Sequence, residues 1–277
     1  KKFKPLAVFF AFSGVLVALL GIGTFSQVNS ITSSINSLTG LSPKIISIIV
    51  AALVGLIVIG GIKNISKVSS KIVPIMAILY LIACGVILAV NFEAIPSAFM
   101  TIISSAFTGH AAMGGFTGAV MKDAISKGVA RGVFSNESGL GSAPIAAAAA
   151  KTHWPAEQGL ISMTGTFIDS ILICTLTGLT LVITGIWTTD TSAALMTQGA
   201  FSTVFGSFGG ATLSICLVLF AFTTILGWNY YGERCIEFLF GVKGIKPYRL
   251  VFVLMVALGG FLQVQLVWTI ADIVNAL

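Results

Sequence analysis

Long apolar runs separated by short polar stretches dominate this chain. No charged residue occurs between Pro5 and Pro43 or between Thr191 and Gly232. Apolar runs of this length predict helices that cross a membrane. The pattern predicts spans at 5–30, 45–62, 72–92, 130–150, 158–187, 210–231 and 249–266, and the start of another near 268.

The predicted span at 130–150 contains a polar interruption. Its apolar run stops at Asn136 and Glu137, and it resumes at Pro144 with a run of alanine. The pattern therefore predicts a membrane helix with a non-helical gap at 136–141. Backbone groups freed by such a gap must bond to protein, water, an ion or a substrate. Discontinuous helices near the midplane are where secondary transporters hold substrate and coupling ion.

Composition supports a membrane protein. Hydrophobic residues make up 56% of the 277 residues and charged residues 9%, whereas soluble domains have about 25% charged residues. The fold class predicted is all-α: a polytopic membrane helix bundle, with residues 1–277 forming a single transmembrane domain. The chain lacks an initiating Met, and its last residues, TIADIVNAL, stop inside an amphipathic apolar segment, so we expect this domain to be incomplete at both ends.

The basic residues indicate orientation rather than a nucleic-acid partner, although the net charge is +6. They sit in short segments between apolar runs, and most of them fall on one side of the predicted topology. The positive-inside rule makes that side cytoplasmic. The residues assigned to it are Lys1, Lys2, Lys4, Lys63, Lys67, Lys71, Lys151, Arg234, Lys243, Lys246 and Arg249. The N-terminal end of the chain is therefore predicted to be cytoplasmic.

Polar residues inside the predicted spans are candidates for function. Thr223 and Thr224 are adjacent hydroxyls that could coordinate Na⁺, or simply bond back to their own helix. Gln27 could bind a substrate or join two helices. Asp169 could serve transport or bond structurally to threonines or freed backbone, and Glu137 could brace the gap. No sequence motif of catalysis or of ATP binding is present, so the pattern does not indicate an enzyme.

The run GVARGVFSNESGLGSAPIAAAAAKTHWPAEQGLISMTGTFIDS closely resembles the signature of the sodium:alanine symporters, the alanine or glycine:cation symporter family. Three other stretches agree with that family: GGIKNISKVSSKIVPIMA, FAFTTILGWNYYGERCIEFLFG and LVWTIADIVNAL. The resemblance extends over nearly the whole chain. It implies a LeuT-like inverted-repeat transporter, of which this chain covers roughly the third core helix to the start of the tenth.

The resemblance also implies site residues. Thr223 and Thr224 match the hydroxyl pair at the sodium site of that fold, and Thr224 is also expected near the substrate. Asn136, Ser138 and Gly139 match the unwound part of the sixth core helix. Phe25, Gln27 and Trp228 would face the pocket, although Trp228 could also belong to an interfacial aromatic belt.

The function implied is Na⁺-coupled symport of alanine and glycine by alternating access, in a multi-pass protein of the plasma membrane. Na⁺ would be the coupling ion, and the partners would be a small amino acid and the lipid bilayer. The N-terminal dipole end of the half-helix after the gap would face the substrate carboxylate. The alternatives are an ion channel, which needs a continuous pore, and a non-transporting structural subunit of a membrane complex, which would not need the gap.

Overall fold

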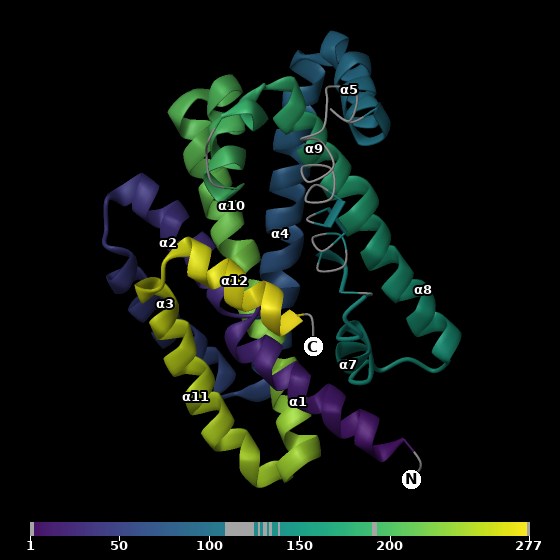
Figure 1. The fold of residues 1–277 in the computed structure, drawn as a ribbon, viewed down its shortest axis with the longest axis vertical. Helices are drawn as coiled ribbons and strands as arrows, with labels where there is room; N and C mark the ends of the chain where they lie inside the picture. The colour runs from purple at the N-terminus through teal and green to yellow at the C-terminus, as the bar shows by residue number, and fades with distance from the viewer. Residues whose placement is uncertain are drawn as a thin grey trace, which may run out of the picture. The chain divides into compact units, whose positions relative to one another are not determined.

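The computed structural model describes residues 3–108, 125–126, 128–129, 132, 135–137, 139–189 and 193–275, and every regular element within them is a helix (Figure 1). The chain divides into two compact units. The first unit combines Lys1–Leu79 with Ala211–Leu277, and the second is Tyr80–Gly210. Two long helices, α4 (Gly61–Val90) and α10 (Ala193–Phe240), each contribute to both units.

The first unit packs its helices around α3 and α11. Its other elements are α1 (Lys4–Leu20), α2 (Phe25–Thr39), α3 (Pro43–Val58), η5 (Val242–Gly244), α11 (Ile245–Leu258), η6 (Gly259–Phe261) and α12 (Val264–Asn275). α3 and α11 lie side by side, and α2 contacts both α3 and α12 (Figure 1). Apolar residues at helical spacing, such as Val54 and Val58 on α3 and Phe252 and Val256 on α11, are buried. Burial of these stripes stabilises the unit.

The second unit is built on one long helical segment. Its elements are η1 (Phe92–Ala94), α5 (Ile95–Thr108), α7 (Ala143–Ala147), α8 (Pro155–Thr166), the π-helical turn η3 (Phe167–Ile173), α9 (Cys174–Ile183) and η4 (Ile186–Thr188). α8, η3 and α9 run on as one helical segment, Pro155–Ile183. α5 packs on α9, with Leu88, Ala98 and Leu179 in a shared buried cluster. Tyr80 joins this unit through its hydroxyl, 2.6 Å from Oγ1 of Thr177.

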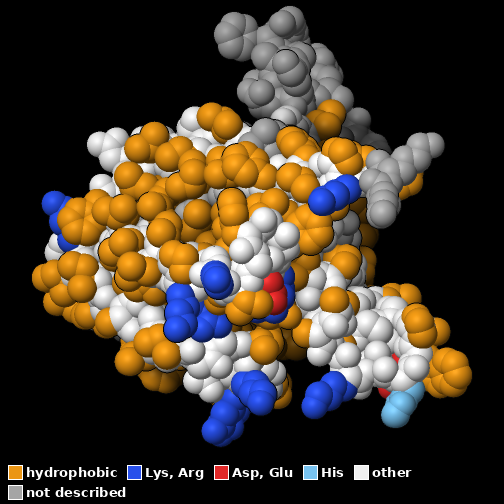
Figure 2. Space-filling view, turned by 90° about the horizontal axis from the view of Figure 1, so that it is seen from below, with side chains coloured by type: hydrophobic (Ala, Val, Ile, Leu, Met, Phe, Trp, Pro, Cys, Tyr) orange, Lys and Arg blue, Asp and Glu red, His pale blue; other side chains and the backbone are white. Residues whose placement is uncertain are grey.

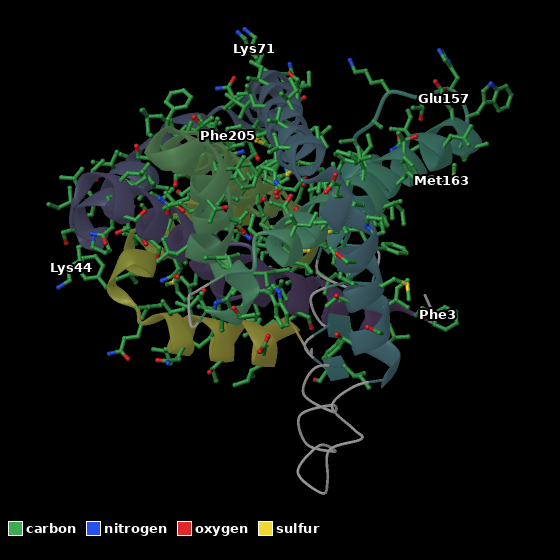
Figure 3. The ribbon with its side chains drawn as sticks, turned by 90° about the horizontal axis from the view of Figure 1, so that it is seen from above. Phe3, Lys44, Lys71, Glu157, Met163 and Phe205 are labelled. Atoms are coloured by element: carbon green, nitrogen blue, oxygen red, sulfur yellow. The ribbon has the colours of Figure 1, made fainter. Side chains whose placement is uncertain are left out.

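Among the described residues, five helical segments are long and apolar enough to cross a membrane: Lys4–Thr39, Gly61–Val90, Pro155–Ile183, Leu195–Phe240 and Val242–Phe261. The predicted membrane helix bundle is confirmed at that level. Large apolar side chains remain exposed along these segments, as a lipid-facing surface requires. Figure 2 shows hydrophobic side chains over most of the face it presents, with Lys and Arg gathered in a few places. Lys44 and Lys71 project away from the ribbon (Figure 3).

Several boundaries differ from those predicted. The span predicted at 5–30 is interrupted, because α1 ends at Leu20 and α2 begins at Phe25. α4 begins at Gly61, so the basic residues 63–71 lie on a helix instead of in a loop. The helix predicted at 210–231 extends from Ala193 to Phe240, and it bends at Gly206, whose φ of 63° is left-handed. Glycine adopts this conformation at little cost, which allows the bend.

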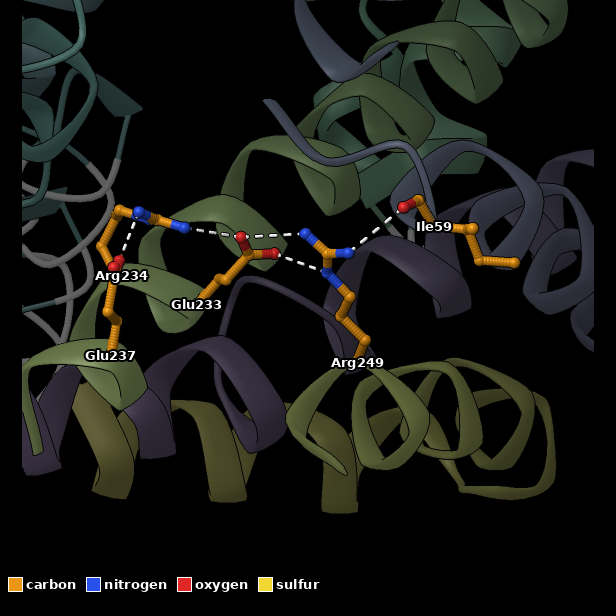
Figure 4. A network of polar contacts seen from close by, with 5 residues as sticks. All are labelled: Ile59, Glu233, Arg234, Glu237 and Arg249. Carbon is orange, nitrogen blue, oxygen red and sulfur yellow. Dashed lines mark hydrogen bonds and ion pairs between the residues drawn. The ribbon is translucent and has the colours of Figure 1, made fainter. Parts of the chain in front are cut away.

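A charged network anchors the end of α10 in the first unit (Figure 4). The Glu233 carboxylate, with its side chain 3% exposed, accepts hydrogen bonds from Nε of Arg249 at 2.8 Å and from Arg234 at 2.7 Å. Arg249 also donates to the carbonyl oxygen of Ile59, 3.2 Å away, and Arg234 pairs with Glu237. The network ties α10 and α11 to the turn between α3 and α4, and the two guanidinium groups compensate a buried carboxylate.

Candidate functional site

The interruption between α1 and α2 lies against Trp228 of α10. A Cβ atom on Gly23 would lie 2.6 Å from Cγ of Trp228, so only glycine lets the backbone approach the indole this closely. Trp228 is 4% exposed and packs edge-on against Tyr231, with ring centroids 5.3 Å apart. Phe25, at the start of α2, is also 4% exposed. Trp228 is therefore an interior residue of the first unit.

Polar side chains satisfy the carbonyl groups that this interruption frees. Thr24 donates its hydroxyl to the carbonyl oxygen of Ala18 at 2.5 Å. Ser26 and Gln27 both donate to the carbonyl oxygen of Ile22, at 2.9 and 3.1 Å. The amide nitrogen of Gln27 thus stabilises its own helix junction, a role that the sequence pattern did not predict. Its contact with a substrate remains a prediction.

Thr223 and Thr224 both use their hydroxyl protons within α10. Thr223 donates to the carbonyl oxygens of Leu219 and Phe220 at 3.1 and 3.0 Å, and Thr224 donates to that of Phe220 at 2.9 Å. This back-bonding is the structural alternative considered for the pair. It is compatible with cation binding, because a hydroxyl that donates its proton still has oxygen lone pairs to offer.

The segment predicted to be broken is non-helical where it is described. Asn136, Glu137 and residues 139–141 form bends and turns. Glu137 has a φ of 59° and Gly141 a φ of 69°, and a left-handed φ is uncommon for a residue other than glycine. The Ser142 hydroxyl donates to the Glu137 carboxylate at 3.0 Å, which braces the turn. The predicted gap is confirmed for these residues, whereas Ser138 lies outside the described residues.

The helix that follows the gap is short. α7 covers only Ala143–Ala147, with Pro144 in its first turn as proline prefers. Within the span predicted at 130–150, the described residues are therefore helical at Gly132, at Ser135 and over Ala143–Ala147, with bends and turns in between. A helix this short has little macrodipole, so a dipole contact with a substrate carboxylate gains no support here.

Asp169 contacts the edge of the gap. Ser135 donates its hydroxyl to Oδ2 of Asp169 at 2.6 Å, and Asn136 donates its side-chain amide to Oγ of Ser170 at 2.9 Å. Ser170 donates to the same Asp169 oxygen at 3.3 Å. Asp169 thus has structural hydrogen bonds, as the alternative proposed for it required, but its partners are serines and not the expected threonines. Sequence reasoning missed Ser135 and Ser170, although each adjoins a polar residue within an apolar segment.

The predicted site residues fall into two sets. Phe25, Gln27, Thr223, Thr224 and Trp228 belong to the first unit. Asn136 and Gly139 belong to the second unit, where Asn136 contacts Ser170. Each set combines a helix interruption with hydroxyl or amide side chains, which is the arrangement that discontinuous transporter helices offer to ions and substrates.

Comparison with known proteins identifies the family. A model of the sodium:alanine symporter family matches residues 1–277. An uncharacterised transporter of Haemophilus influenzae is 54% identical over 274 residues, covering 98% of this chain and 60% of that protein. The sodium/alanine symporter AgcS of Methanococcus maripaludis is 49% identical over 276 residues, with the same coverage. The probable sodium/glutamine symporter GlnT of Bacillus subtilis is 36% identical over 249 residues, covering 89% of this chain and 51% of that protein.

The chain spans about 60% of the length of the relatives it matches first. These relatives are transporters and not enzymes, and the five long apolar segments fit a multi-pass membrane protein. Because the family model matches the entire chain and the relatives agree with it, this chain belongs to the sodium:alanine symporter family.

Proposed function

We propose that the full-length protein is a Na⁺-coupled symporter of alanine, and of glycine as well, that works by alternating access. The observation that carries the proposal is the non-helical gap at 136–141, in a chain 49% identical to a relative named a sodium/alanine symporter. An uninterrupted helix would satisfy its own backbone and leave nothing for a ligand. A gap leaves N–H and C=O groups that can bind the charged ends of an amino acid.

The sodium site of the proposal is formed by Thr223 and Thr224. Na⁺ is a hard cation that prefers oxygen ligands. Both hydroxyls are partly buried and keep lone pairs, since their protons go to carbonyl groups of α10. The lone pairs of the two threonine oxygens therefore remain available to a cation, while the hydroxyl protons are donated to carbonyl oxygens of the same helix.

For the substrate, the proposal takes the residues that the family resemblance implies: Asn136, Ser138 and Gly139 of the gap, the side chains of Phe25, Gln27 and Trp228, and Thr224, which would also serve the ion. Two aromatic walls would leave room for only a small side chain, which fits alanine and glycine. Glutamine, named for the relative GlnT, would need more space. The fold of the proposal is the LeuT-like inverted repeat implied by the family resemblance.

Coupling follows if ion and substrate both favour the same conformer, so that each raises the affinity for the other by the same factor. In the proposed topology the N-terminal end of this chain lies in the cytoplasm and the protein in the plasma membrane. Single cysteines at positions 67 and 243 should then react with an impermeant thiol reagent from the cytoplasmic side. Labelling of the two positions from opposite sides would exclude this topology.

The proposal is tested with the full-length protein in liposomes. Labelled alanine should enter in a saturable manner when a sodium gradient is imposed, and uptake should fall to background in potassium alone. Unlabelled glycine should compete, and glutamine should compete much less. Uptake that is unsaturable would indicate a channel, and no uptake in any gradient would indicate a structural subunit.

A further inference from the structure

The strongest feature beyond the proposed site is the contact between the gap and the π-helical turn η3 in the second unit. We propose that Asp169 and Ser170 are positioning residues. Through hydrogen bonds they hold Ser135, which is helical, and Asn136, which is not, at the point where the helix gives way to the gap, and they thereby set the affinity of the gap for the amino acid. This inference rests on the proposed function, since it assigns a consequence for substrate binding to the same segment.

The contact joins two consecutive residues at the edge of the gap to two consecutive residues of η3. Ser135 meets Asp169 and Asn136 meets Ser170, at 2.6 and 2.9 Å. A third hydrogen bond, from Ser170 to Asp169 at 3.3 Å, connects the two pairs. Two adjacent bonds to consecutive residues restrict rotation of the backbone at 135–136 more than one bond could. The residues they restrict come immediately before Glu137, whose left-handed φ begins the turn.

The π-helical turn explains how consecutive residues of one helix reach the gap. Within Phe167–Ile173 the backbone hydrogen bonds span five residues, as between N–H of Cys174 and the carbonyl oxygen of Asp169. Such turns are rare, widen the helix locally and occur frequently at functional sites. Pro155–Thr166 and Cys174–Ile183 on either side are ordinary α-helix. The irregularity is therefore confined to the turn that carries Asp169 and Ser170.

The contacts indicate that Asp169 acts through hydrogen bonding. A distance of 2.6 Å is typical of a hydroxyl that donates to a carboxylate. Within the described part of the chain, the observed ion pairs of Arg234 and Arg249 go to Glu233 and Glu237, and none reaches Asp169. An asparagine at position 169 would keep an oxygen that accepts from Ser135, whereas an alanine would remove it.

The experiment compares Asp169→Asn with Asp169→Ala in the full-length protein in liposomes, measuring KM and maximal rate of sodium-driven alanine uptake. Asp169→Ala should raise KM about tenfold or more, because a hydrogen bond to a charged group is lost. Asp169→Asn should keep KM within about fivefold of the wild type, because a neutral bond replaces it. The maximal rate per folded molecule should change much less than KM in both variants.

Thr164→Val is the matched control, because the Thr164 hydroxyl on α8 donates to the carbonyl oxygen of Leu160 in its own helix. It should leave KM unchanged. Should Asp169→Ala fail to fold, Ser135→Ala removes the same bond from the other side and should raise KM in the same way. The proposal is overturned if Asp169→Asn is as impaired as Asp169→Ala, since the charge would then be required, or if Ser135→Ala keeps the wild-type KM. Failure of the wild-type protein to take up alanine would instead refute the proposed function.

Discussion

Gly232 gives the sharpest test of the packing in the first unit. It faces Ala18 of α1 and Tyr248 of α11, and a Cβ atom there would lie 2.9 Å from Cβ of Ala18 and 2.6 Å from Cζ of Tyr248, with the Tyr248 hydroxyl closer still. Tyr248 is 4% exposed, so its ring cannot simply turn away. Gly232→Ala should therefore cost roughly 1–3 kcal/mol through overpacking, offset by up to about 1 kcal/mol from the helix propensity of alanine.

The Tyr248 hydroxyl allows this cost to be traced to its cause. That oxygen is buried and has no hydrogen-bond partner among the described residues. Tyr248→Phe alone should therefore be close to neutral or slightly stabilising, because it removes an unpaired polar group. In the Tyr248→Phe background, Gly232→Ala should cost about 1 kcal/mol less than in the wild type, a coupling of the size expected for residues in contact.

The assay is thermal unfolding of the full-length protein in detergent, for the wild type, both single variants and the double variant. Gly227→Ala is the matched control, since it lies on the same helix and a Cβ atom there would meet nothing within 4 Å. It should be neutral or stabilise by up to about 1 kcal/mol. Equal destabilisation by Gly232→Ala in the wild-type and Tyr248→Phe backgrounds would refute the reasoning, as would destabilisation by Gly227→Ala of the same size.

Three other perturbations test the charged network and the two parts of the proposed site. Glu233→Gln should destabilise the protein by about 2 kcal/mol or more, because Arg249 loses the buried negative charge that it pairs with. Glu237 is more exposed, so Glu237→Gln should cost at most about 1 kcal/mol. Similar unfolding temperatures for the two variants would contradict this expectation. Thr224→Val should raise the sodium concentration needed for half-maximal alanine uptake, with little effect on the unfolding temperature. An unchanged sodium dependence would mean that the Thr224 hydroxyl only bonds back to its own helix. Gly139→Leu should abolish alanine binding while the protein still elutes as a folded species. Normal alanine binding by this variant would show that the gap is not part of the substrate site.

The predicted membrane bundle depended on a property that is local in sequence. A helix that crosses lipid must satisfy its backbone internally and present apolar side chains along its length, so length and apolarity of the runs were sufficient to predict most of the long helices. The gap at 136–141 was predictable for a similar reason. Asn136, Glu137 and two glycines together within an apolar run disfavour a continuous helix, and the structure is non-helical there in the residues it describes.

The interruption at Gly21–Thr24 was not predictable in the same way. Gly21 and Gly23 indicated only that helices could approach closely, and isolated glycines are common in membrane helices. The interruption is stabilised by the Thr24 hydroxyl on the Ala18 carbonyl and by contact of Gly23 with Trp228, which is remote in the sequence. When the contact partner lies on another helix, the local sequence around a residue does not show that the contact exists.

The same limit applies to the polar pairs. Arg234 and Arg249 could be assigned to one side of the membrane from charge alone, and Asp169 could be singled out as an acid within a span. Their partners depend on how helices pack: the π-helical turn that carries Asp169 and Ser170 to Ser135, and the approach of α11 to the end of α3. Hydropathy is a property of each segment by itself, whereas a hydrogen bond requires two segments to be placed within about 3 Å of each other, and only tertiary packing does that.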